Sequence, residues 1–142
     1  MTIGFQVHGL PASKGSMKSF VPKGWKRAIL TNDSEKTKPW ENVIRVAAIE
    51  AKVKAGMQSG ELLDCPIQMQ LHFRLIKPKS RPKKVIWPEK KPDMDKLLRA
   101  VFDALTGSIY TDDARVVHLT MTKNWACAEW PPGVLIEIVP LR

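Results

Sequence analysis

The stretch Lys91-Pro-Asp-Met-Asp-Lys-Leu-Leu-Arg-Ala-Val-Phe-Asp-Ala-Leu-Thr-Gly107 determines how this chain is organised. Its apolar residues recur at the spacing of one helical face, and they are Met94, Leu97, Leu98, Val101, Phe102 and Leu105. Pro92 precedes this run and Gly107 follows it, at the positions where these residues commonly border a helix. The pattern therefore predicts an amphipathic helix over about 93–106.

The other side of the predicted helix is polar. Asp95, Arg99 and Asp103 are each four residues apart, so they form a ridge that must face water, a ligand or a partner. Asp93 and Asp95 can converge if Asp93 is still extended and Asp95 opens the first turn, a boundary that Pro92 favours. Two adjacent carboxylates repel each other unless a divalent cation lies between them. Mg²⁺ and Mn²⁺ prefer oxygen ligands of this kind.

A second acidic pair, Asp112 and Asp113, follows a turn and directly precedes the apolar residues Val116 and Val117. This pair could supply a third carboxylate from a neighbouring strand. The alternative needs no metal, because an Asp at a helix N-cap stabilises the helix by about 0.5 to 2 kcal/mol and Asp is common in turns. Spacing by itself leaves both interpretations open.

Taken together, the pattern D-x-D, F-D-A-L and D-D-A-x-V-V over residues 91–117 resembles the RusA-type Holliday junction resolvases. Members of this family are small dimeric endonucleases, often carried by phages, that cut four-way DNA junctions with magnesium or manganese. The resemblance implies a RusA-like fold, Mg²⁺ or Mn²⁺ as cofactor, branched DNA as substrate, a homodimer, and a role in DNA recombination and repair.

Carried over by position, the resemblance assigns metal binding to Asp93, Asp95 and Asp113, with Asp112 beside them. Asp103 matches an acid inside the family's helix, for which a structural role is one interpretation. The three metal-binding acids are also the candidate catalytic residues.

The chain departs from the family pattern at two positions. Lys96 stands where Asn is common, and we count it among the candidate DNA contacts. Arg99 stands where a functional Lys is found. Because Arg does not release its proton near neutral pH, a catalytic Arg99 should bind phosphate or stabilise charge. The alternative is an intrahelical ion pair with Asp95 or Asp103, worth about 0.2 to 0.5 kcal/mol.

Composition narrows the class of protein. A chain of 142 residues suggests one domain, 1–142, and 23 Lys plus Arg against 14 Asp plus Glu give a net charge of +9. Such a charge favours a polyanionic partner, with nucleic acid first and an anionic membrane surface second. We expect no membrane span and no signal peptide. The isolated Cys65 and Cys127 fit reduced thiols in a cytoplasmic protein. The family resemblance implies that this is the cytoplasm of a bacterial or phage-infected cell.

The remaining periodicity predicts a single α+β domain with two main helices packed on one mixed sheet. The expected elements are strands at 3–7, 67–75, 116–125 and 134–139, a hairpin with arms 18–21 and 27–31, and a second helix from Thr37 that ends before Gly56. Trp25, at the hairpin tip, is a candidate for stacking on an unpaired base, and core packing is the alternative.

Two basic stretches are candidate DNA contacts. The loop 13–18 combines Gly and Ser with Lys14 and Lys18 and could bind phosphate, although it also fits an ordinary surface turn. The strongest charge run, 77–91, contains prolines that exclude a regular helix, and it leads directly into Asp93. Its candidate contacts with the phosphate backbone are Lys79, Arg81, Lys83 and Lys84. A solvated or disordered linker is the alternative for this run.

The sequence therefore predicts a structure-selective endodeoxyribonuclease that resolves four-way junctions by metal-dependent phosphodiester hydrolysis. Two alternatives stay open. One is a non-catalytic nucleic-acid-binding protein, in which the aspartates merely cap a helix. The other is a nuclease for another kind of branched DNA.

Overall fold

The computed structural model describes residues 1–14, 17–20, 29–32 and 36–142. Its elements in chain order are β1 (Ile3–His8), β2 (Met17–Phe20), β3 (Ile29–Asn32), α1 (Thr37–Lys54), β4 (Ile67–Leu75), α2 (Met94–Leu105), the short 3₁₀ helix η1 (Asp113–Arg115), β5 (Val116–Trp125) and β6 (Gly133–Pro140). No helix within the described ranges is long and apolar enough to cross a membrane.

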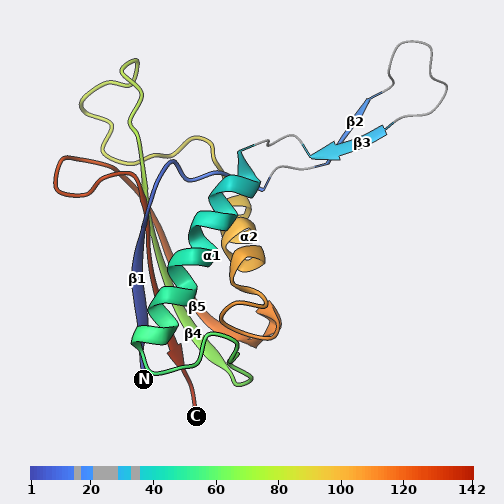
Figure 1. The fold of residues 1–142 in the computed structure, drawn as a ribbon. Helices are drawn as coiled ribbons and strands as arrows, with labels where there is room; N and C mark the ends of the chain where they lie inside the picture. The colour runs from blue at the N-terminus through green and yellow to red at the C-terminus, as the bar shows by residue number, and fades with distance from the viewer. Residues whose placement is uncertain (15–16, 21–28, 33–35) are drawn as a thin grey trace.

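The main sheet has four strands in the order β1-β6-β4-β5, with β4 and β5 parallel and the other neighbours antiparallel. Helices α1 and α2 both lie on one face of it, as Figure 1 shows with the sheet seen nearly edge-on. The predicted α+β class with two helices on a mixed sheet is confirmed. The predicted hairpin forms as β2 and β3, but these strands make a separate two-stranded sheet. Its tip, including Trp25, lies outside the described residues.

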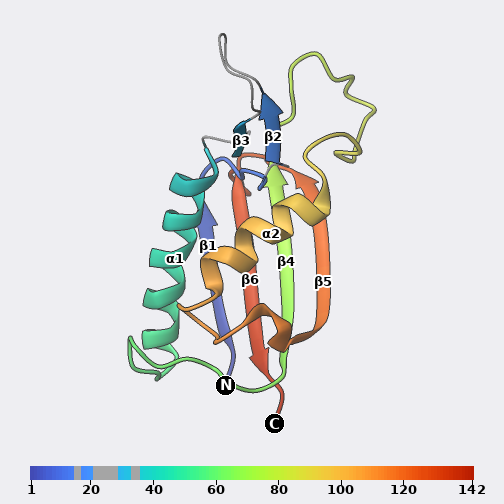
Figure 2. The same ribbon diagram turned by 90° about the vertical axis from the view of Figure 1, so that its right-hand side faces the viewer.

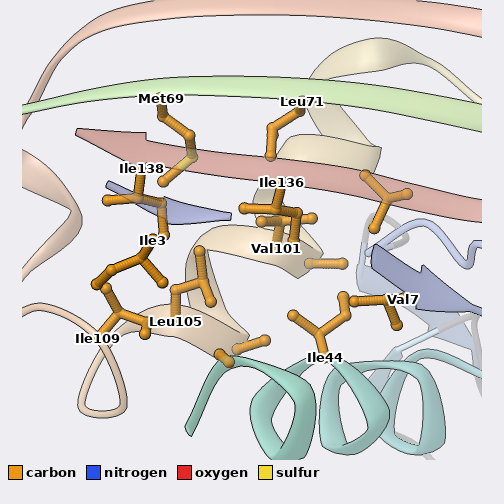
Figure 3. Close-up of a cluster of buried hydrophobic side chains, with 14 of the residues drawn as sticks. Ile3, Val7, Ile44, Met69, Leu71, Val101, Leu105, Ile109, Ile136 and Ile138 are labelled. Atoms are coloured by element: carbon orange, nitrogen blue, oxygen red, sulfur yellow. The ribbon is translucent and has the colours of Figure 1, made fainter. Parts of the chain in front are cut away.

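Buried and half-buried residues alternate along β4, so its side chains point to the two faces of the sheet in turn. Met69, Leu71 and Phe73 are fully buried toward the helices, whereas Gln70 and His72 are only half-buried on the other face. Figure 3 shows the core that results, with side chains from β1, β4 and β6 meeting Ile44 of α1 and Val101 and Leu105 of α2. Burial of the apolar faces thus fixes which side of α2 points away from the sheet.

The connection from β4 through α2 to β5 determines where the acidic residues lie. Parallel strands need a crossover, so the chain must travel back along the sheet in α2 before β5 begins. Figure 2 shows α2 running diagonally across the sheet, from the end where β4 and β5 finish toward the end where they start. The start of α2 and the residues just before β5 therefore lie at different ends of the sheet.

Candidate active site

Asp93 and Asp95 are positioned by the first turn of α2. Asp93 is the N-cap residue with extended backbone angles, φ −71° and ψ 147°, and the helix begins at Met94. Asp93 is thus extended and Asp95 lies in the first helical turn, which is the condition for their carboxylates to point toward each other. The side chain of Asp93 forms no capping hydrogen bond. Both acids are exposed, and neither forms an ion pair with any described residue. The helix-capping interpretation of Asp93 therefore has no support from its contacts.

The polar ridge of α2 divides into two parts. Arg99 is exposed and forms neither of the intrahelical ion pairs considered from the sequence, since the described ion pairs of this region join other residues. Asp103 instead accepts the ammonium of Lys14, with Nζ and Oδ2 2.9 Å apart, and Lys14 also lies 3.3 Å from Glu41 Oε1. The hydrogen bond that Lys14 donates to Asp103 is the main cause that raises the pKa of Lys14. Asp103 thus joins α2 to α1 through Lys14.

The second acidic pair surrounds η1. The Asp112 side chain accepts a hydrogen bond of 2.9 Å from the amide of Ala114 and so caps this short helix. Asp113 is half-buried, and burial together with the neighbouring Asp112 and Asp103 raises the pKa of its carboxyl group. Asp112 and Asp113 therefore lie near the C-terminal half of α2, where Asp103 is, and not near its start.

The single chain does not bring the predicted metal ligands together. Lys123 of β5 contacts Pro92, next to Asp93, whereas Asp113 immediately precedes the start of β5 at Val116. Lys123 follows Val116 by seven residues, which is about 23 Å of extended strand. In the part of the chain that the structure describes, no three His, Cys, Asp or Glu side chains form a group that could hold a metal ion. Asp93 and Asp95 therefore stand as a pair of carboxylates.

The basic run 77–91 is a structured loop. Val85 is its central anchor, because its carbonyl oxygen accepts hydrogen bonds from Lys77 Nζ at 2.8 Å and from Trp125 Nε1 at 3.1 Å. Pro88, which belongs to the same loop, is buried. As the prolines predict, it contains no regular helix or strand. The contacts do not support a disordered linker.

Lys123 holds the end of this loop against the sheet. Its ammonium donates to the carbonyl oxygen of Lys90 at 2.9 Å and to that of Pro92 at 3.0 Å, immediately before Asp93. Sequence reasoning missed this residue. The available signal was alternation along β5, in which Leu119, Met121 and Lys123 share the face that lies toward the helices. Lys123 is thus a positioning residue for the start of α2.

The candidate DNA contacts differ in how available they are. Lys79, Lys83 and Lys84 are exposed, whereas the Arg81 side chain is 14% exposed and forms an ion pair with Glu89. Lys96 is half-buried, and its carbonyl oxygen accepts the amide of Lys14 at 3.1 Å. The backbone of Lys18 lies in β2, and its side chain is outside the described part of the structure. The DNA-binding role of each of these residues stays a prediction.

The chain is similar to known proteins over most of its length. A protein of Bacillus subtilis described as uncharacterized protein YqaN is 25% identical over 128 residues, which cover 87% of this chain and 88% of that protein. The family described as endodeoxyribonuclease RusA matches residues 18–139, a range that includes both acidic pairs and the basic loop. With this match over most of its length, the chain belongs to the RusA endodeoxyribonuclease family.

Proposed function

We propose that this protein is a divalent-metal-dependent endonuclease that resolves four-way DNA junctions, in recombination and repair of DNA in the cytoplasm of a bacterial or phage-infected cell. Membership of an endodeoxyribonuclease family supports the reaction class. The observation that carries the proposal is the pair Asp93 and Asp95, exposed and without ion-pair partners among the described residues, directly beside a structured basic loop. In this proposal the cations of the loop would hold the phosphate backbone, and the two neighbouring acids would hold a metal ion.

The carboxylates present fit Mg²⁺ or Mn²⁺. Mg²⁺ is commonly held by one or two carboxylates, with waters and substrate phosphate completing its octahedron, so Asp93 and Asp95 are a sufficient protein contribution. When bound, such an ion would lower the pKa of a coordinated water and stabilise the leaving oxyanion. Arg99 lies one turn after Asp95 on the exposed ridge, where its permanent charge can bind the phosphate being cut.

The position of Asp113 supports a dimer as part of the proposal. A junction presents two scissile strands related by approximate two-fold symmetry, which a C2 dimer with two sites would match. Within one chain Asp113 lies far from Asp93 and Asp95. We propose that the dimer brings Asp113 of one subunit toward Asp93 and Asp95 of the other, which would add the third carboxylate.

The proposal is tested by incubating the protein with an end-labelled four-way junction, or with a linear duplex of the same sequence, in Mg²⁺ or in EDTA. We expect paired nicks on the junction in Mg²⁺ and none on the duplex or in EDTA. Tight junction binding without cutting in either Mg²⁺ or Mn²⁺ would instead favour a non-catalytic binding protein. Cutting of flaps or forks in preference to junctions would favour a nuclease for other branched DNA.

The exposed lysines of the basic loop should carry the salt dependence of DNA binding. Each phosphate contact that is lost lowers the slope of log K against log salt by about 0.9, so replacing Lys79, Lys83 and Lys84 together by Ala should lower it by about 2 to 3. Fluorescence anisotropy over a salt series measures this slope. Lys54→Ala, which removes an exposed lysine at the far end of α1, is the control and should change nothing. An unchanged slope in the triple variant would exclude this loop as the contact.

Lys123→Met should impair cutting more than binding. The substitution keeps an apolar stem and removes the ammonium that holds the Lys90 and Pro92 carbonyl oxygens, so Asp93 loses its fixed position. A displacement of about 1 Å at a reacting centre can cost about 100-fold in rate. We expect kcat to fall by about 10- to 100-fold, with junction affinity within about 3-fold of wild type. Equal losses of affinity and kcat would contradict a positioning role.

A further inference from the structure

The face of the sheet that carries no helix has a pocket of about 360 Å³ near the ends of β4 and β5. Its lining includes His72 and Arg74 of β4, Asn124 and Trp125 of β5, Trp130 of the β5–β6 loop and Leu135 of β6. We call these residues the sheet pocket. Its size falls within the range of small-ligand sites, and a mostly apolar wall with a few polar groups is typical of them. It lies on the opposite face of the sheet from α2 and its carboxylates.

The sheet pocket contains a buried positive charge. Arg74 is 3% exposed, and no described carboxylate lies within ion-pair distance of it. Its Nε donates to Pro131 O at 2.7 Å and its Nη1 to Gln6 Oε1 at 3.3 Å, while its Nη2 has no acceptor in the described structure. Buried charges are normally paired, and an unpaired one in a concave, low-dielectric site attracts anions. The missing counter-charge points to an anionic ligand.

An exposed aromatic ring accompanies this charge. The guanidinium carbon of Arg74 lies 5.5 Å from the centre of the Trp130 ring, and Trp130 is 48% exposed. Because about half of Trp130 is exposed, part of this indole is open to solvent and can contact a planar group. Because every nucleobase has a flat face, stacking on exposed aromatic rings is the usual way in which proteins bind unpaired nucleotides. A flat group joined to an anion is the ligand that fits both features.

The sheet pocket also adjoins the basic loop. Trp125 lines the pocket, and its Nε1 donates to Val85 O at the centre of that loop. Only the Trp125 side chain lies between the centre of the loop and the pocket. A DNA strand whose phosphates contact Lys83 and Lys84 can therefore continue into the pocket. This continuity favours a nucleotide within a DNA strand over a free one.

We propose that the sheet pocket binds one unpaired nucleotide of a DNA strand, with its base stacked on Trp130 and its phosphate attracted by Arg74. The proposal concerns a nucleic-acid site separate from the carboxylates, and it adds single-stranded DNA to the four-way junction as a ligand. Branched DNA contains unpaired nucleotides wherever its branch point opens. The site would hold such a nucleotide on the face of the sheet away from the cutting site.

The test is the affinity of a labelled single-stranded oligothymidylate, measured by fluorescence anisotropy in EDTA, so that the result does not depend on whether the protein cuts DNA. Trp130→Ala should weaken binding by about 5- to 100-fold, because the stacking surface is lost from an exposed position. Trp87→Ala, which removes a still more exposed indole (60%) from the basic loop, is the matched control and should retain wild-type affinity. Wild-type affinity in Trp130→Ala, or a greater loss in Trp87→Ala, would overturn the proposal.

Further binding measurements separate the contribution of base stacking from that of charge. They also show whether the bound nucleotide belongs to a DNA strand or is free. An oligonucleotide without bases should bind wild type and Trp130→Ala with equal affinity. A lower affinity for Trp130→Ala would show that Trp130 does not act by stacking on a base. Arg74→Met should lower the salt slope for single strands by about 0.7, whereas Arg74→Lys should not. If Arg74→Met does not fold, the affinities measured with Trp130→Ala still test the proposal. Displacement of the oligonucleotide by an equal concentration of thymidine monophosphate would overturn a strand site in favour of a free nucleotide.

Discussion

Asp95→Asn should abolish cutting of a four-way junction while leaving the protein folded and bound to DNA. If Asp95 is a metal ligand as proposed, its loss withdraws the metal-ion stabilisation of the transition state, which is worth several kcal/mol, so we expect the rate to fall by about 1,000-fold or more. Junction affinity should stay the same or rise, because a negative charge that repels phosphate is lost. Single-turnover cleavage and anisotropy on the same junction measure the two effects.

The stability of this variant distinguishes catalysis from helix capping. Asp95 is exposed and has no described ion pair, so Asp95→Asn should change the free energy of unfolding by less than about 0.5 kcal/mol. Glu50→Gln removes another exposed carboxylate, from α1, and should leave cutting, binding and stability at wild-type values. Undiminished cutting by Asp95→Asn would remove this acid from the mechanism, and a marked loss of stability would restore a structural role.

Gly133→Ala should destabilise the fold strongly. Gly133 opens β6 with φ +153°, and a Cβ there would lie 1.9 Å from the backbone oxygen of Val7 on β1 and 3.1 Å from Arg74 Nη2. Since two backbones must separate to admit this atom, we expect a loss of about 3 to 5 kcal/mol in unfolding free energy. Thermal unfolding should show a fall in Tm of about 10 to 20 °C.

Gly4→Ala is the matched control, because Gly4 lies in β1 and pairs with Glu137 in the same β1–β6 ladder. A Cβ at Gly4 would meet no atom within 4 Å, and its φ is not positive. Alanine should therefore be neutral or stabilise the strand by up to about 1 kcal/mol. Similar Tm values for Gly133→Ala and Gly4→Ala would show that β1 and β6 can move apart at little cost.

The secondary structure followed closely from the sequence. Strict alternation over 67–75 predicted β4 with both of its ends, and the apolar spacing of Leu97, Val101 and Leu105 predicted the buried face of α2. These patterns are local and follow from burial of one face, so no knowledge of distant residues was needed. The extended backbone of Asp93 meets the condition under which the sequence allowed its carboxylate to converge with that of Asp95.

The contacts of charged side chains did not follow from the sequence. Lys52, near the end of α1, is fully buried, and its ammonium donates to the carbonyl oxygens of Glu61 and Ser108 at 2.6 Å each. Lys14 and Arg81 looked like equally free cations, yet each forms an ion pair with an acid that is distant in sequence or across a turn. Long side chains select partners by spatial proximity, which depends on how the elements pack.

The sequence by itself determined the acidic pairs, the helix that carries Asp93 and Asp95, the basic loop before it and, through their combined pattern, the family. The tertiary structure decided how these parts are arranged. Because β4 and β5 are parallel, the crossover through α2 places Asp93 at one end of the sheet and Asp113 at the other, although they are twenty residues apart in the chain. The same topology brings Lys123 to the start of α2 and leaves Arg74 beneath Trp130 on the opposite face.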